Sequence, residues 1–83
     1  MNRGAIYQQI DAERTRQRIK WAPMHPWGVG DCSSEHVQPI TKAAVLSEEC
    51  GEVARAVLEQ DTDQLRTELV QVAAVAVAWL ESL

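Results

Sequence analysis

Two consecutive apolar segments of this 83-residue chain carry carboxylates at helical spacing, and this feature constrains the fold more than any other. The first segment contains residues 48–52 (EECGE), and the second contains residues 68–71 (ELVQ). Such spacing predicts helices, each with its carboxylates near one face. A carboxylate among apolar side chains is costly unless it is paired, and a hard divalent cation is the simplest partner. Because protein-bound Mg²⁺ usually also contacts phosphates, the sequence predicts metal-dependent phosphate chemistry.

The chain is expected to form a single all-α domain over residues 1–83, with helices at roughly 5–20, 37–60 and 62–82. The stretch 22–36 is rich in Pro, Gly, Asp and Ser and is expected to be a loop. Pro39 suits the start of the second helix, and Thr62 or Asp61 can cap the third. The short break at residues 61–63 makes the second and third helices antiparallel neighbours. Ile6, Ile10 and Ile19 are the expected apolar anchors of the first helix.

The segment Leu69–Leu80 is apolar except for Gln71, and a helix that is apolar nearly all round should be buried on several sides. A chain this short has too few other elements to bury it. We therefore expect a homo-oligomer, a dimer or a tetramer, with this segment in the shared core. The segment is shorter than the roughly 20 apolar residues that cross a bilayer, so no membrane span is predicted.

The net charge is −4, which argues against general nucleic-acid binding. The charge is uneven, because residues 1–20 carry a balance of +3 and residues 41–83 a balance of −5. The basic segment is either a solvated helix face or a neighbour of an anionic ligand. The two cysteines form no CxxC pattern, and the N-terminus lacks the apolar core of a secretory signal, so a cytoplasmic location is expected.

Helical geometry predicts where the acidic side chains point. Taking about 100° per residue, the second helix has an apolar seam, and Glu49 and Glu52 flank it. Glu68 and Gln71 occupy the same positions beside the seam of the third helix. The two seams comprise Leu46, Cys50, Val53 and Val57, and Leu65, Leu69, Val72 and Ala76. When the seams face each other, the four polar side chains converge and can share an ion.

The EExxE pattern, followed by an ExxD-like element at the start of an apolar helix, resembles the all-α nucleoside triphosphate pyrophosphohydrolases, and the small MazG-like proteins in particular. Residues 46–83 carry the resemblance, and residues 13–26 are similar to the N-terminal part of that group. It implies a four-helix-bundle core built by two chains. It also implies Mg²⁺-dependent cleavage of an NTP or dNTP between the α and β phosphates, giving the monophosphate and pyrophosphate.

The resemblance implies that Glu49, Glu52 and Glu68 hold Mg²⁺, with Mn²⁺ as the alternative, and that Glu48 or Glu49 activates water. Gln71 stands where the family pattern has aspartate. Its amide carbonyl can ligate a cation but brings no charge. The candidates for binding the substrate are Lys20, Trp21 and Lys42.

Three alternatives remain open at this stage. A non-catalytic MazG-like module, used for dimerisation or nucleotide binding, would keep the fold while Gln71 removes the chemistry. A zinc site would use His25, Cys32, His36 and Cys50, although their spacing fits no familiar zinc motif. Alternatively, the glutamates are ordinary boundary positions that pair with Arg14 or Arg55.

Overall fold

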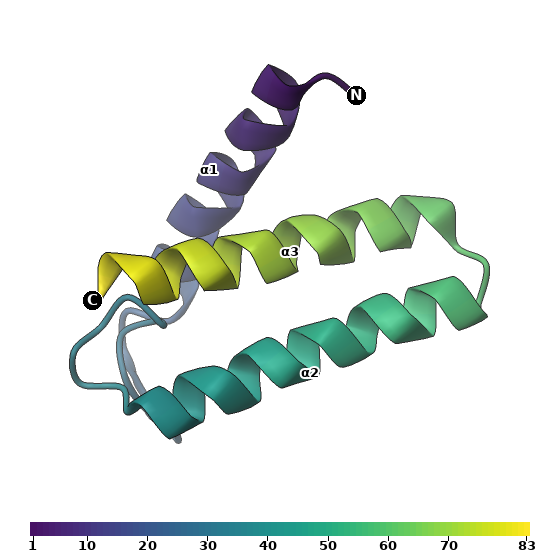
Figure 1. Ribbon diagram of the computed structural model, residues 1–83. Coiled ribbons are helices and arrows are strands. Elements are labelled where there is room, and N and C mark those ends of the chain that lie inside the picture. Colours follow the sequence, from purple (N-terminus) through teal and green to yellow (C-terminus); the bar gives the residue numbers. More distant parts are fainter.

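The computed structural model describes residues 1–83 and contains three helices (Figure 1). Helix α1 spans Arg3–Lys20, α2 spans Pro39–Leu58 and α3 spans Thr62–Glu81. The α1–α2 loop contains a short antiparallel pair, β1 (Met24–His25) and β2 (Gly28–Val29). The all-α class and the three predicted helices are confirmed. The strand pair was not predicted, because two residues are too few to show an alternating pattern.

Local sequence signals explain where the helices begin. Asn2 caps α1 by accepting a hydrogen bond from the backbone N–H of Ala5 at 2.8 Å. Pro39 is the first residue of α2, where its missing N–H costs nothing. Asp61 caps α3 and accepts from the backbone N–H of Gln64 at 3.0 Å. Of the two predicted caps for α3, the structure therefore selects Asp61.

Helix α3 packs against both other helices, whereas the backbones of α1 and α2 lie farther apart. Figure 1 shows α2 and α3 side by side and antiparallel, as predicted, with α1 crossing near the C-terminal half of α3. A small apolar core of Cys32, Val75 and Ala78 joins the loop to α3. Trp27, Val45 and Leu46 pack against it. The loop and the N-terminal half of α2 are thereby fixed to α3.

The predicted seams of α2 and α3 are only partly right, because five of their eight residues are half-buried and three are exposed. The inward face of α2 includes Lys42, Val45, Glu49 and Ala56, whereas Cys50 and Val57 are exposed. On α3 the buried side chains are Glu68, Ala74, Val75 and Ala78, while Leu69 is 51% exposed. The carboxylate positions therefore turn toward the neighbouring helix, and part of each apolar seam faces outward.

The fully buried side chains of α1 are polar, and of the three isoleucines predicted to anchor this helix only Ile10 is half-buried. Ile19 is 72% exposed, whereas Arg14 and Gln17 are buried. Arg14 donates to Asp31 Oδ2 at 2.7 Å and to Glu81 Oε2 at 2.8 Å. A buried guanidinium is tolerated because these carboxylates pair with it. This network ties α1 to the loop and to the end of α3.

Several large apolar side chains stay exposed in the single chain. They include Ile40, Val57, Leu58, Leu69 and Leu80. Such exposure agrees with the homo-oligomer, which remains a prediction. Gly51 has open space around the position of a Cβ atom, so close packing within this chain does not explain it. None of the three helices is long and apolar enough to span a membrane.

Candidate functional site

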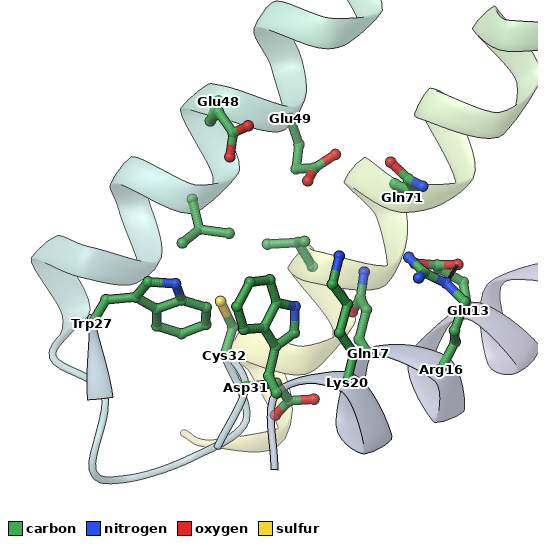
Figure 2. A pocket seen from close by; sticks show the side chains of 13 residues that line it. Glu13, Arg16, Gln17, Lys20, Trp27, Asp31, Cys32, Glu48, Glu49 and Gln71 are labelled. Carbon is green, nitrogen blue, oxygen red and sulfur yellow. Dashed lines mark hydrogen bonds and ion pairs between the residues drawn. The ribbon is translucent and has the colours of Figure 1, made fainter. Parts of the chain in front are cut away.

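A cavity of about 180 Å³ lies where α1, the loop, α2 and α3 meet (Figure 2). Its lining combines acidic, basic, amide, aromatic and apolar side chains. They are Glu13, Arg16, Gln17, Lys20, Trp21, Trp27, Asp31, Cys32, Val45, Glu48, Glu49, Gln71 and Val75. Most small-molecule sites exceed roughly 300 Å³. One chain therefore encloses only part of a ligand as large as a nucleoside triphosphate.

The acidic side of the cavity centres on the amide of Gln71. One end of this amide lies 2.9 Å from Glu68 Oε2 and 3.1 Å from Glu49 Oε2; Figure 2 draws the oxygen there, and we assign it as the nitrogen, which donates to both carboxylates. The reverse orientation would set an amide oxygen against two carboxylate oxygens with nothing positive between them. Glu68 is buried, and its Oε1 accepts from Gln64 Nε2 at 2.6 Å. Carboxylates from α2 and α3 thus meet at one neutral side chain.

The electrostatic environment of Glu49 is unfavourable to its charge. Burial raises the pKa of Glu49, and the neighbouring carboxylates of Glu48, Glu68, Glu52 and Glu13 raise it further. Neither Glu49 nor Glu68 forms an ion pair with a Lys, Arg or His. Amide hydrogen bonds satisfy the oxygens without neutralising them. The carboxylates of the cluster are therefore groups that could hold a cation.

The side-chain oxygens of Glu49, Glu68 and Gln71 are donors of the kind that a hard cation such as Mg²⁺ takes. No three His, Cys, Asp or Glu side chains are grouped to hold a metal ion. The protein donors here are two carboxylates and one amide, so water or phosphate would complete the shell.

The opposite side of the cavity is basic and aromatic. Lys20 Nζ lies 5.0 Å from the centre of the Trp21 ring and forms no ion pair. The Trp21 and Trp27 rings lie 5.1 Å apart, with an angle of 51° between their planes. Figure 2 shows Lys20 pointing into the space that Glu49 and Gln71 face. An anionic, aromatic ligand would find complementary groups on this side.

A pair of charges marks the rim on α1. Arg16 holds Glu13 through two contacts of 2.7 and 2.6 Å. The hydrogen bond from Arg16 to Glu13 raises the pKa of the Arg16 guanidinium, and the charge of Glu49 contributes to this shift. Arg16 is therefore a fixed positive group near the acidic cluster, and it also partly offsets the charge of Glu13.

Comparison with models of protein families matches residues 38–82 to the MazG nucleotide pyrophosphohydrolase domain. This range covers more than half of the chain. The chain belongs to the MazG nucleotide pyrophosphohydrolase family. Searches of curated proteins and of solved structures gave no match. The resemblance noted in the sequence is thereby confirmed, and the matched range contains α2 and α3 with all the predicted metal-binding residues.

In this MazG-family chain the structure brings together most, but not all, of the predicted site residues. Glu49 and Gln71 line the cavity, and Glu68 does not line it but contacts Gln71. Glu48 also lines the cavity and is exposed. Glu52 is half-buried, acts on Glu49 through its charge, and does not line the cavity. The predicted convergence is therefore tightest for Glu49, Glu68 and Gln71, and their roles in metal binding remain predictions.

The predicted substrate-binding residues divide in the same way. Lys20 and Trp21 line the cavity, but Lys42 does not. Lys42 is 3% exposed and donates to Ser82 Oγ at 2.8 Å, and that hydroxyl donates to the Trp79 carbonyl. The structure therefore corrects the placement of Lys42, because its ammonium group is used to hold the end of α3.

Sequence reasoning missed several cavity residues. On α1 it overlooked Glu13 and Gln17, which together with Arg16 and Lys20 follow helical spacing and share one face. That spacing was readable in the sequence. Asp31 and Cys32 were also missed as lining residues. They lie in the loop, where no periodic signal shows which side chains turn inward.

The rival sites predicted from the sequence are not formed. Cys32 is buried and Cys50 is exposed, and no group of metal-binding side chains includes them. His25 Nε2 hydrogen-bonds to the Gly30 carbonyl at 2.7 Å. The zinc prediction is therefore wrong in this structure. Pairing of Glu48, Glu49 or Glu52 with Arg14 is also not formed, because Arg14 pairs with Asp31 and Glu81 instead.

Proposed function

We propose that this MazG-family chain is a Mg²⁺-dependent nucleoside triphosphate pyrophosphohydrolase. It would release the NMP or dNMP and pyrophosphate, and it would also accept Mn²⁺ in place of Mg²⁺. The observation that carries the proposal is the meeting of Glu49 and Glu68 at Gln71, beside a cavity with a free lysine and two tryptophans. Membership of the family supports the proposal, since the matched range includes Glu49, Glu68 and Gln71.

The acidic residues would have distinct tasks. Glu49, Glu68 and the Gln71 carbonyl would hold the cation, and Glu52 would add negative charge nearby. Bound Mg²⁺ would offset charge on the phosphate oxygens during the reaction. Glu48 lines the cavity and makes no hydrogen bond, so its carboxylate is available to orient water or accept its proton. Glu49 is the other candidate for this task.

The basic side would bind the rest of the nucleotide. Lys20 is placed to contact phosphate, and the Trp21 and Trp27 rings are placed to contact the base or the sugar. The small volume of the cavity and the exposed apolar side chains support a homodimer or homotetramer whose second chain completes the site. A cytoplasmic location is part of the same proposal.

Purified protein should hydrolyse at least one NTP or dNTP in the presence of Mg²⁺. The measurement is a panel of the common NTPs and dNTPs, with pyrophosphate and monophosphate both quantified and a sample with excess chelator as control. Equal amounts of the two products, lost on chelation, are expected. Release of inorganic phosphate instead would contradict cleavage between the α and β phosphates.

A second candidate is a nucleotide-binding module without catalysis. The observation that favours it is Gln71 itself, which fills the space between the carboxylates without the charge of an aspartate. In that case nucleotides bind, for example with quenching of the tryptophans that line the cavity, but no member of the panel is cleaved. The same experiment therefore separates the two functions.

Replacing Lys20 with methionine should raise KM for the nucleotide about tenfold. The reason is the loss of one charge-assisted contact to phosphate, which is worth about 1.5 kcal/mol. The matched control is Lys42→Met, because that lysine is buried outside the cavity. Steady-state kinetics should show the effect for Lys20 alone. An equal rise in KM for both variants would contradict the assignment of Lys20.

A further inference from the structure

The amide of Gln71 occupies the one position that both carboxylates share. It is held between Glu68 on its own helix and Glu49 on α2, at 2.9 and 3.1 Å. Glu68 is 7% exposed and has two amide partners, Gln71 and Gln64, but it forms no ion pair with a cationic side chain. Neutral donors satisfy the hydrogen-bonding capacity of a buried carboxylate but bring no opposite charge. The amide therefore holds the carboxylates in place without neutralising them.

An amide can serve such a pair in two ways. Its nitrogen donates to carboxylates, and its oxygen ligates hard cations. The two ends are nearly equal in size, and the terminal torsion of glutamine is soft and roughly two-fold. Rotation about this bond exchanges nitrogen and oxygen at the same place without moving the backbone. Aspartate or glutamate at this position has no end that can donate when ionised.

We propose that Gln71 is a positioning residue with two states, whose amide turns over when the divalent cation binds. In the metal-free protein its nitrogen holds Glu49 and Glu68 together. In the metal-bound protein its oxygen faces the same point and completes the protein ligands. This inference rests on the proposed function only in taking the cation to bind at this cluster. It adds that glutamine at position 71 makes the metal-free protein more stable and weakens its affinity for the cation.

The proposal predicts opposite effects of one substitution on stability and on cation binding. Gln71→Glu keeps an oxygen ligand but removes the donor and adds a charge. The metal-free variant should therefore have a lower Tm than the wild type. Its Kd for Mg²⁺ or Mn²⁺ should be at least about tenfold lower, so that Tm recovers at saturating cation. Gln71→Met should lower the metal-free Tm and also weaken cation binding about tenfold.

The matched control is Gln64→Glu. It places the same new charge beside the same carboxylate, because Gln64 bonds to Glu68 Oε1, but it lies away from Glu49. Calorimetry with Mg²⁺ alone, and electron paramagnetic resonance with Mn²⁺ alone, should show much less tightening for this variant. Equal tightening in both variants would mean that added charge, rather than the position of Gln71, explains the effect, and would overturn the proposal.

The rotation itself is visible by NMR of the wild-type protein. The side-chain NH₂ signal of Gln71 is identified by its loss in Gln71→Met. It should be protected from exchange without cation, and should shift and lose protection at saturating Mg²⁺. An unchanged signal, or no binding of Mg²⁺ by the wild type, overturns the proposal. If the cation binds as described but no nucleotide is cleaved, the two-state role stands and the enzymatic function fails. If nucleotides are cleaved but these readouts do not change, the enzymatic function stands and the two-state role of Gln71 fails.

Discussion

Replacing Glu68 with glutamine is expected to lower Mg²⁺-dependent pyrophosphohydrolase activity by about 100-fold or more. Loss of groups that only support a metal ligand already costs up to about 100-fold, and Glu68 is proposed to be a ligand itself. The side chain is buried and bonded to Gln64 and Gln71, so no neighbour can move in to replace its charge. Glu49→Gln should have a comparable effect. The measurement is pyrophosphate release at saturating Mg²⁺ and nucleotide.

Glu49→Gln should not destabilise the metal-free protein. Burial and neighbouring carboxylates raise the pKa of Glu49 on folding, so its charged form opposes folding at pH 7. Removing a charge from the cluster relieves this repulsion, and glutamine keeps the size of the side chain. Urea unfolding at a fixed protein concentration should give an unchanged or increased free energy of unfolding. Lost activity in a more stable protein is typical of a functional residue, because function and stability often conflict.

Glu59→Gln is the matched control, because this exposed glutamate follows the end of α2 and lies outside the cavity. It should change neither activity nor stability by a measurable amount. Two results would contradict the assignment of the site. One is full activity in Glu68→Gln and Glu49→Gln. The other is a large loss of stability in Glu49→Gln, which would show that this carboxylate supports the fold.

The sequence predicted the features that depend on local chemistry. Helix starts at Pro39 and after Asp61 follow from residues at the helix ends themselves. The proximity of Glu49, Glu68 and Gln71 followed from helical spacing and from the short turn between α2 and α3. Spacing is preserved when a helix rotates, so the cluster was found even though each predicted seam was only partly right.

The features that were not predicted depend on contacts between distant parts of the chain. The rotation of α2 and α3 is set by what the loop and α1 place against them. Nothing near Arg14 in the sequence shows that Asp31 and Glu81 will pair with it, since they lie 17 and 67 residues away. Reading apolar residues as anchors then favoured Ile19, which the structure leaves exposed. A polar buried face becomes predictable only when its partners are known.

Replacing Arg14 with methionine is expected to lower the free energy of unfolding by about 3 kcal/mol, since it leaves a buried carboxylate without its cation. Both side chains of this ion pair are buried, with Arg14 6% exposed and Asp31 4% exposed. Glu81 is more than a third exposed, and its pairing with Arg14 should contribute within about 1 kcal/mol. Methionine retains most of the length of the side chain, so the charge is the main loss. Urea unfolding at a fixed protein concentration measures the effect.

Arg18→Met is the matched control on the same helix, because Arg18 is 69% exposed and reaches Glu81 only at 3.4 Å. It should change stability by less than about 0.5 kcal/mol. Burial alone would raise the pKa of Asp31, but hydrogen bonds from Ser33 and Arg14 hold it below its usual value. The stability gained from this lowered pKa is present above about pH 4 and is lost as pH falls further. Without Arg14 the carboxyl group should instead take up a proton more readily. The difference in the free energy of unfolding between wild type and Arg14→Met should therefore narrow from pH 7 toward pH 4. A difference that stays constant over this range would show that Arg14 acts through packing alone.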